Sequence, residues 1–339
     1  MKSSIILRLI AAMLAVALLL CACGKAEPPA DVDTPPDSSA GSENPTDTTP
    51  PEPEPEPEPS PYGDLLSEMT DVGKTVTVYG DLKGEDYSEA ISSLEKVLDG
   101  YSRTISVVAY SLDNRKALSY NTEAKIFSAC AVKAPYSLYC CYEMEKGKAT
   151  LDTKMKYEKK HYETGTGDMQ YSPVDTTFDM RTIINKSMSI SDNVGYMMQV
   201  DYFGREGYNK WISSLDIGAA SLAIKPTVWS LYTKSRDLAV VWREMYKYFE
   251  TQSEYSKFLY ASCTNTAGNY ATAALEGVEY SHKQGHNRTG DWKSYSDAGI
   301  VWKEGNPYII VILTNAPGPS SYDAGIMADV IKIVHNQLF

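Results

Sequence analysis

The order of predicted strands and helices is the feature that most restricts how this chain can fold. Alternating or continuously apolar runs typical of strands occur in five places: residues 105–112, 116–120, 278–283, 298–302 and 308–314. Helical periods dominate between the two groups, with the best candidates at residues 182–186, 194–203, 207–215 and 235–249. Strands from both ends of the chain can then share one sheet. The pattern therefore predicts an α/β fold with an antiparallel five-stranded sheet, flanked by N- and C-terminal helices, plus an inserted all-helical lobe.

The two flanking helices and the domain limits follow from the same pattern. Residues 86–100 and 321–338 place apolar side chains on one helix face. We expect an N-terminal extension and first helix over residues 62–104, including a short strand at 75–79, and the main domain over residues 105–339. Its helical lobe is expected at about residues 128–277.

The first 22 residues have the composition of an export signal. Lys2 and Arg8 precede an apolar run that ends at Leu20. The sequence Leu20-Cys-Ala-Cys23 resembles a bacterial lipoprotein box, which implies lipidation at Cys23 and a place outside the cytoplasm, anchored by lipid to the cell membrane. A plain signal peptide or a short membrane anchor remains an alternative.

Residues 23–61 are predicted to form a disordered linker, because they contain almost nothing apolar to bury. Pro and Glu alternate from Pro51 to Pro59, a composition typical of an extended tether. Most of the net charge of −12 lies in this linker, which has ten acidic residues against Lys25. The remaining domain is only mildly acidic, so nothing indicates nucleic-acid binding.

Cys130 and Lys133 form the most reactive pair that the sequence predicts. They are one turn apart where a loop enters a helix, so they can share a helix face. A helix N-terminus and a nearby ammonium both favour the thiolate form of cysteine. Pro135 suits a first helical turn, and Gly147 suits the helix end. We therefore expect a nucleophile at this helix tip, unless Cys130 is held in a disulfide, which the sequence leaves open.

Three short motifs occur in a recognisable order: Cys130-Ala-Val-Lys133, Ser191-Asp-Asn193 and Lys283-Gln-Gly285. Their order and placement resemble the class A β-lactamase branch of the penicillin-recognising enzymes, whose signature is Ser-x-x-Lys, Ser-Asp-Asn and Lys-Thr-Gly. The resemblance covers about residues 105–339. It implies a β-lactamase/transpeptidase-like fold and a site that transfers acyl groups.

The resemblance also implies catalytic roles for four residues. Cys130 takes the place of the nucleophile, and Lys133 would activate it. Ser191 would pass a proton to the leaving nitrogen, and Lys283 would assist it and attract the substrate's carboxylate.

Substrate binding is implied for Asn193, Gln284, Gly285 and Arg288. Asn193 would form hydrogen bonds both to Lys133 and to the amide of the substrate. Arg288 enters because Arg288-Thr-Gly290 is an alternative third motif, with arginine in place of lysine. Lys283 is preferred, since the run before it resembles the family's approach to this strand.

The sequence departs from the family pattern at three points, of which the missing glutamate predicts slow turnover and all three favour a non-catalytic module. Cysteine replaces the nucleophilic serine, Gln284 replaces threonine, and residues 216–237 contain no glutamate to activate the deacylating water. The expected reaction is β-lactam opening through an acyl-enzyme, in a protein of the antibiotic response.

Other functions stay open at this point. A D-Ala-D-Ala peptidase-like penicillin-binding protein would act on cell-wall peptides by the same acylation. A non-catalytic envelope lipoprotein for binding or sensing is a second alternative, and a cysteine hydrolase using His282 or His286 as base is a third. We expect a monomer with a small-molecule substrate, and no metal or organic cofactor is implied.

Overall fold

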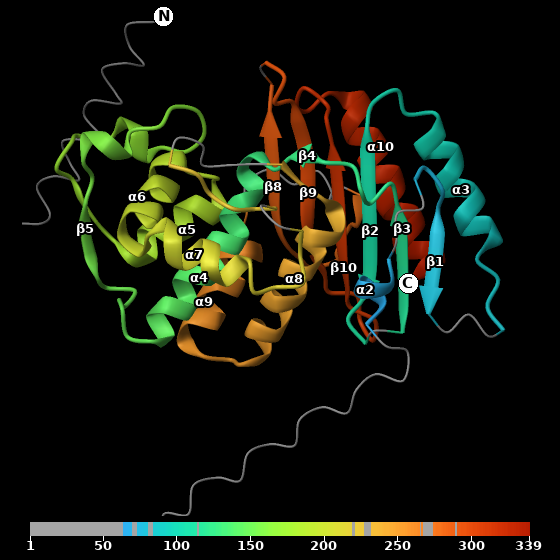
Figure 1. Cartoon of the computed structure of the whole chain (residues 1–339), viewed down its shortest axis with the longest axis horizontal. Helices are drawn as coiled ribbons and strands as arrows, with labels where there is room; N and C mark the ends of the chain where they lie inside the picture. The colour runs from blue at the N-terminus through green and yellow to red at the C-terminus, as the bar shows by residue number, and fades with distance from the viewer. Residues whose placement is uncertain are drawn as a thin grey trace, which may run out of the picture. The chain divides into compact units, whose positions relative to one another are not determined.

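A six-stranded antiparallel sheet forms the centre of the structure (Figure 1). The structure is a computed structural model that describes residues 64–69, 73–80, 84–113, 115–218, 221–226, 232–264, 266, 274–288 and 290–339. The predicted signal peptide, the lipidation site Cys23 and the linker to residue 61 lie outside the described residues, so these predictions stay untested.

The strand order is β1-β3-β2-β10-β9-β8, and every neighbouring pair is antiparallel. The strands are β1 (Thr77–Gly80), β2 (Ile105–Ser111), β3 (Lys116–Tyr120), β8 (Tyr280–Asn287), β9 (Ser294–Val301) and β10 (Tyr308–Thr314). Chain segments from both ends of the domain therefore share one sheet, and the predicted fold class is confirmed.

The predicted number of five strands is wrong by one. The short strand expected at residues 75–79 joins the sheet as β1, at the free edge of β3, where Val78 lies opposite Leu118. Gly80 permits this pairing, because its φ is +110° and an added Cβ would lie 2.0 Å from the carbonyl oxygen of Arg115. Edge pairing of this kind depends on a partner strand some forty residues away, which the local pattern does not contain.

The strands in the middle of the sheet are buried on both faces. Along β10, Ile309, Val311 and Leu313 pack into one apolar core, and the alternate residues Ile310 and Ile312 pack into a second. The first core fills the space toward the helical lobe. The second lies under the helices formed by the two ends of the domain, so the sheet separates two hydrophobic layers.

The helices form two groups, one on each side of the sheet (Figure 1). On the outer side, α3 (Ser88–Asp99) packs against α10 (Ser321–Ile333) and the π-helical turn η5 (Val334–Leu338). On the other side α8 (Ser235–Glu250) packs against β2 and β10. The helical lobe also contains α4 (Lys133–Glu145), α5 (Met180–Ser189), α6 (Asn193–Phe203), α7 (Arg205–Ile212) and α9 (Glu254–Thr264).

Short elements complete the fold: helix α2 (Leu65–Glu68), the 3₁₀ turns η1 (Ala129–Val132), η2 (Lys159–His161) and η3 (Met169–Tyr171), and the paired strands β4 (Ile126–Phe127) with β7 (Tyr232–Thr233) and β5 (Lys154–Lys156) with β6 (Thr177–Asp179). The structure contains helix α9, which the sequence pattern did not predict. The strand predicted to end at Lys283 continues to Asn287.

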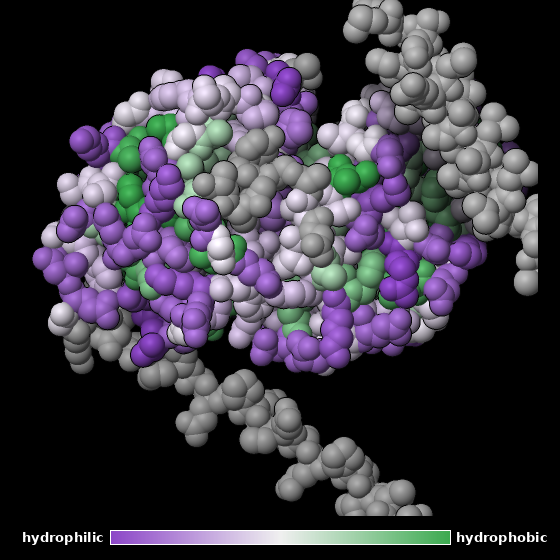
Figure 2. Space-filling model, turned by 180° about the vertical axis from the view of Figure 1, so that it is seen from behind, coloured by the Kyte–Doolittle hydropathy of each residue, from purple (hydrophilic) through white to green (hydrophobic). Residues whose placement is uncertain are grey.

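The molecular surface is mostly polar on the face shown in Figure 2, where apolar residues form small separate patches. Within the described ranges, no helix has the length and apolar character needed to cross a membrane.

Candidate active site

Cys130 lies in the 3₁₀ turn η1, just before α4 begins at Lys133. The sequence predicted a helix tip at this point, and the structure adds the tighter turn in front of it. The preceding residue, Ala129, has a φ of +45°, which is uncommon for a residue with a side chain and is typical of functional sites. Cys130 is buried, with 7% of its surface exposed.

Lys133 is completely buried and connects Cys130 to the second motif. Its Nζ donates to the carbonyl oxygen of Ser191 at 2.6 Å and to Oδ1 of Asn193 at 2.7 Å. Burial lowers the pKa of the Lys133 ammonium, and the negative charge that Cys130 can carry opposes this shift. The amine is thus placed to exchange a proton with the thiol.

The Ser191-Asp-Asn motif is held rigidly at the start of α6. The Asp192 carboxylate accepts from the backbone N–H of Gly195 at 2.8 Å and of Met169 at 2.9 Å, so it caps the helix and fixes the loop before it. Ser191 has a φ of +59°. This turn directs both Ser191 and Asn193 toward Lys133.

Lys283 reaches the same place from strand β8. Its Nζ donates to Oγ of Ser191 at 2.9 Å and to the carbonyl oxygen of Gln284 at 3.0 Å. Burial lowers the pKa of Lys283 to about 8, with the charges of Cys130 and Lys133 acting in opposite directions. The Ser191 hydroxyl therefore lies between two amines, since Lys133 Nζ is 3.4 Å from it.

Gly285 allows β8 to approach the Cys130 turn. A Cβ at this position would lie 2.5 Å from the carbonyl oxygen of Ser128 and 2.9 Å from the backbone N of Ala131. A glycine is therefore required here by the close approach of two backbones. Its neighbour Gln284 is partly buried, and its contact with a substrate stays a prediction.

Arg288 lies beyond the end of β8 and is exposed, with its side-chain stem against Gly318. Of the two candidate cations for the third motif, the structure brings Lys283 to Ser191. The pKa of His286, two residues before Arg288, is lowered first by burial and then by the charge of Arg288.

The thiol of Cys130 differs electrostatically from the other described cysteines. Burial acts to raise its pKa, but the charges of Lys133 and Lys283 and hydrogen bonds from Ser191 and Lys133 outweigh burial and lower it. Burial raises the pKa of Cys140 and Cys141 well above the usual value. All four described cysteines are free thiols, so Cys130 is not held in a disulfide.

A loop outside the three motifs borders the site on the side of the helical lobe. The hydroxyl of Thr166 donates to the carbonyl oxygen of Ser191 at 2.6 Å, and Nδ2 of Asn193 donates to the carbonyl oxygen of Thr164 at 2.6 Å. None of these loop residues was predicted from the sequence to belong to the site. The alternation of Thr and Gly over residues 164–167 signals a turn, but not which motif the turn would contact.

His282 is placed unfavourably for the alternative in which it is the base of a cysteine hydrolase. Its Nδ1 is 2.8 Å from Oδ1 of Asp297, and its Nε2 is 2.5 Å from Oγ1 of Thr266. Both ring nitrogens therefore already have partners, and neither partner is Cys130.

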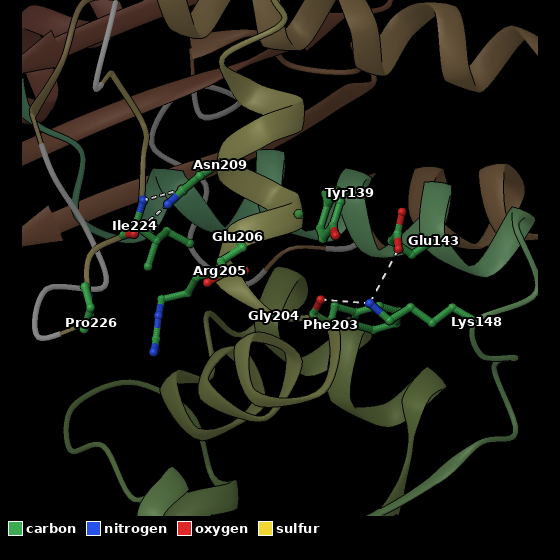
Figure 3. A pocket seen from close by; sticks show the side chains of 11 residues that line it. Tyr139, Glu143, Lys148, Phe203, Gly204, Arg205, Glu206, Asn209, Ile224 and Pro226 are labelled. Atoms are coloured by element: carbon green, nitrogen blue, oxygen red, sulfur yellow. Dashed lines mark hydrogen bonds and ion pairs between the residues drawn. The ribbon is translucent and has the colours of Figure 1, made fainter.

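A separate cleft of about 700 Å³ lies in the helical lobe between α4 and α7 (Figure 3). Among its lining residues, Lys148 donates to Glu143 at 3.5 Å and to the carbonyl oxygen of Phe203 at 2.9 Å. None of the site residues predicted from the sequence lines it. Across the described ranges, no cluster of three or more His, Cys, Asp or Glu side chains could hold a metal ion.

Comparisons with known proteins agree with this geometry. A family model described as "Beta-lactamase enzyme family" matches residues 89–338. No curated protein matches the chain.

Solved structures resemble the chain in fold, at 18–20% sequence identity. A mutant of PBP-A, described as an acyl-enzyme complex with penicillin-G, is 18% identical with a TM-score of 0.64, over 74% of this chain and 95% of that chain. The TLA-1 extended-spectrum β-lactamase is 20% identical with a TM-score of 0.64, over 74% and 98%. A β-lactamase from Chitinophaga pinensis is 18% identical with a TM-score of 0.66, over 74% and 100%.

Proposed function

Because the chain belongs to the beta-lactamase enzyme family, we propose that it is a cysteine acyl enzyme that opens β-lactam rings. The single observation that carries the proposal is the Cys130 thiol, whose pKa is lowered by Lys133 and Lys283 against the effect of burial. A thiolate is the reactive form of cysteine and an intrinsically strong nucleophile.

The proposed acylation uses only groups of this chain and the substrate. The Cys130 sulfur attacks the lactam carbonyl carbon, and backbone N–H groups, including that of Cys130, stabilise the oxyanion. The carbon–nitrogen bond of the ring then breaks. The nitrogen takes a proton from the Ser191 hydroxyl, which regains one from the ammonium of Lys283 at 2.9 Å. The product is a thioester on Cys130 with an opened ring.

Binding is proposed to use the two remaining motif positions. The Lys283 ammonium attracts the substrate's carboxylate, since it is the cation nearest to Ser191 on β8. Asn193 orients the substrate's amide while its own Oδ1 holds Lys133 at 2.7 Å. Gln284, Gly285 and Arg288 are proposed to line the carboxylate end of the substrate.

We propose slow deacylation, because residues 216–237 contain no glutamate to activate a water molecule. The same observation favours a second candidate, a penicillin-binding protein that acts on cell-wall peptides ending in D-Ala-D-Ala. Both candidates form the same acyl-enzyme and differ in how long it persists. We also propose that lipid attached to Cys23 anchors the chain outside the cytoplasm, which metabolic labelling with palmitate and a Cys23→Ala control would test.

Intact-protein mass spectrometry of the reduced chain after benzylpenicillin tests the acylation. We expect a mass increase of one opened penicillin, which is absent in Cys130→Ala and present in Cys140→Ala, a matched loss of a buried thiol on α4. The decay of the adduct then separates a hydrolase from a penicillin-binding protein.

Two other outcomes change the conclusion. An adduct on Cys130→Ser but not on the natural chain would mean that the pocket is sound and that the cysteine has silenced it. An adduct on neither protein would leave a non-catalytic binding or sensing lipoprotein.

A further inference from the structure

Glu163 is a carboxylate at the candidate site for which neither the motifs nor the proposed mechanism has a use. It lies in the loop between η2 and η3 and is partly buried. Within the part of the chain that the structure describes, its carboxylate takes part in no hydrogen bond and no ion pair. A partly buried carboxylate without a partner can bind a cation of another molecule.

The loop that carries Glu163 is attached directly to the second motif. Its neighbour Thr164 accepts a hydrogen bond from the Asn193 side chain at 2.6 Å, and the backbone N–H of Asn193 donates to the carbonyl oxygen of Thr166 at 3.1 Å. Gly165, with a φ of +117°, has no room for a side chain, since a Cβ there would lie 2.9 Å from Nδ2 of Asn193. The backbone next to Glu163 is therefore held by the same residue that is expected to orient the substrate's amide.

The charge of Glu163 reaches the centre of the site. It is one of the negative charges that raise the pKa of Lys133 against the larger effect of burial, together with Cys130 and Asp192. Two other carboxylates near the lysines are already engaged. Asp192 accepts from two backbone N–H groups, and Asp297 is bound to His282.

The site therefore combines opposite charges at two places. Lys283 holds a buried ammonium on the β8 side, and Glu163 has a partly buried carboxylate on the side of Asn193. A substrate that carries both a carboxylate and a cation fits this arrangement better than one with a carboxylate alone.

We propose that Glu163 determines which acyl donors this site prefers, by binding an ammonium or similar cation on the part of the donor next to the scissile amide. The proposal rests on the acylation of Cys130 proposed above. It assigns the substrate class as carboxylated amides with a free amino group, such as peptides that contain a diamino acid.

Three penicillins that differ in the charge of one side chain test this assignment. Ampicillin carries an amino group, benzylpenicillin is neutral at the same position, and carbenicillin carries a carboxylate there. The rate constant for acylation of Cys130 is measured by intact mass at pH 6.5, where the amino group of ampicillin and Lys283 are both protonated. Each rate is expressed relative to benzylpenicillin, so that any general effect of Glu163 on Lys133 cancels.

The variants are Glu163→Gln, the charge-retaining Glu163→Asp and the control Asp175→Asn. Asp175 is an exposed carboxylate between η3 and β6, 3.5 Å from Lys156. Its replacement by asparagine removes one negative charge, as Glu163→Gln does. We expect Glu163→Gln to lower the acylation rate of ampicillin relative to benzylpenicillin by about two- to fivefold, and to raise that of carbenicillin by a similar factor. This is the range expected for a partly exposed charge pair. Glu163→Asp keeps part of the preference, and Asp175→Asn keeps all of it.

Failure of this proposal differs from failure of the proposed function. If all three penicillins acylate Cys130 and Glu163→Gln leaves both ratios unchanged, or changes them no more than Asp175→Asn does, the role of Glu163 is refuted while the acyl enzyme stands. If no penicillin acylates the natural chain, the proposed function fails, and with it the assignment of Glu163.

Discussion

Replacement of Gly285 by alanine should separate β8 from the Cys130 turn. The added Cβ would lie 2.5 Å from the carbonyl oxygen of Ser128, whereas ordinary contacts begin at 3.4 Å. Both obstructing atoms, this oxygen and the backbone N of Ala131, belong to the main chain, so neither can rotate away. The strand and the turn must therefore move apart by about 0.9 Å, the difference between the two distances.

This displacement is large enough to break the contact that brings the third motif to the second. If the whole shift falls along the contact between Lys283 Nζ and Ser191 Oγ, their distance grows from 2.9 Å to about 3.8 Å, beyond hydrogen-bond range. A misplacement of about 1 Å in a reacting group costs on the order of 100-fold in rate. Overpacking itself costs about 1–3 kcal/mol of stability, or roughly 2–12 °C in Tm for a domain of this size.

Acylation by benzylpenicillin, followed by intact mass, and thermal unfolding are measured on Gly285→Ala and on Gly325→Ala. Gly325 lies in α10 with nothing within 4 Å of an added Cβ, so its replacement is a matched control. We expect Gly325→Ala to keep the natural rate and Tm or to gain slightly in Tm. A Gly285→Ala protein that melts and acylates like the natural chain would refute the close approach. A lower Tm with an unchanged rate would refute the dependence of acylation on Lys283.

Three further predictions concern charge and rigidity at the site. Iodoacetamide at pH 7.5 should alkylate Cys130 of the native chain much faster than Cys140. The reason is that the pKa of Cys130 is lowered from 9.0, whereas the pKa of Cys140 is raised well above 9.0. Equal labelling of the two cysteines in a peptide map would contradict this. The rate of acylation should increase with pH as the Cys130 thiolate forms, and then decrease as the pH rises through about 8. The decrease is expected because Lys283, whose pKa is lowered to about 8, loses its charge there. If a Lys283→Gln protein still shows the alkaline decrease, another group causes it. Asp192→Ala removes the acceptor of two buried N–H groups and should cost about 2–4 kcal/mol in urea unfolding, and a loss below about 1 kcal/mol would mean that water replaces the carboxylate.

Strong local patterns could be interpreted from the sequence alone. The sequence predicts strand β10 with its observed bounds, Tyr308–Thr314, because six consecutive apolar residues followed by a threonine leave few other structures possible. The order of strands and helices fixed the fold class for the same reason. The residues Cys130, Lys133, Ser191 and Lys283 could be singled out because each lies in a short local motif, and their catalytic roles stay predictions.

Other properties depend on contacts between distant parts of the chain, which only the tertiary structure decides. The pairing of β1 with β3 added the sixth strand, and the approach of β8 to the Cys130 turn brought Lys283 rather than Arg288 to Ser191. The loop of Glu163 and Thr166 joined the site through hydrogen bonds to residues 191 and 193. The lowered pKa of Cys130 also depends on distant contacts. Two ammonium groups lower it against the effect of burial, and one of them lies some 150 residues away in the sequence. Local sequence determines which secondary structure and which chemical groups are available, whereas distances between those groups, and therefore their charges and partners, are set by packing.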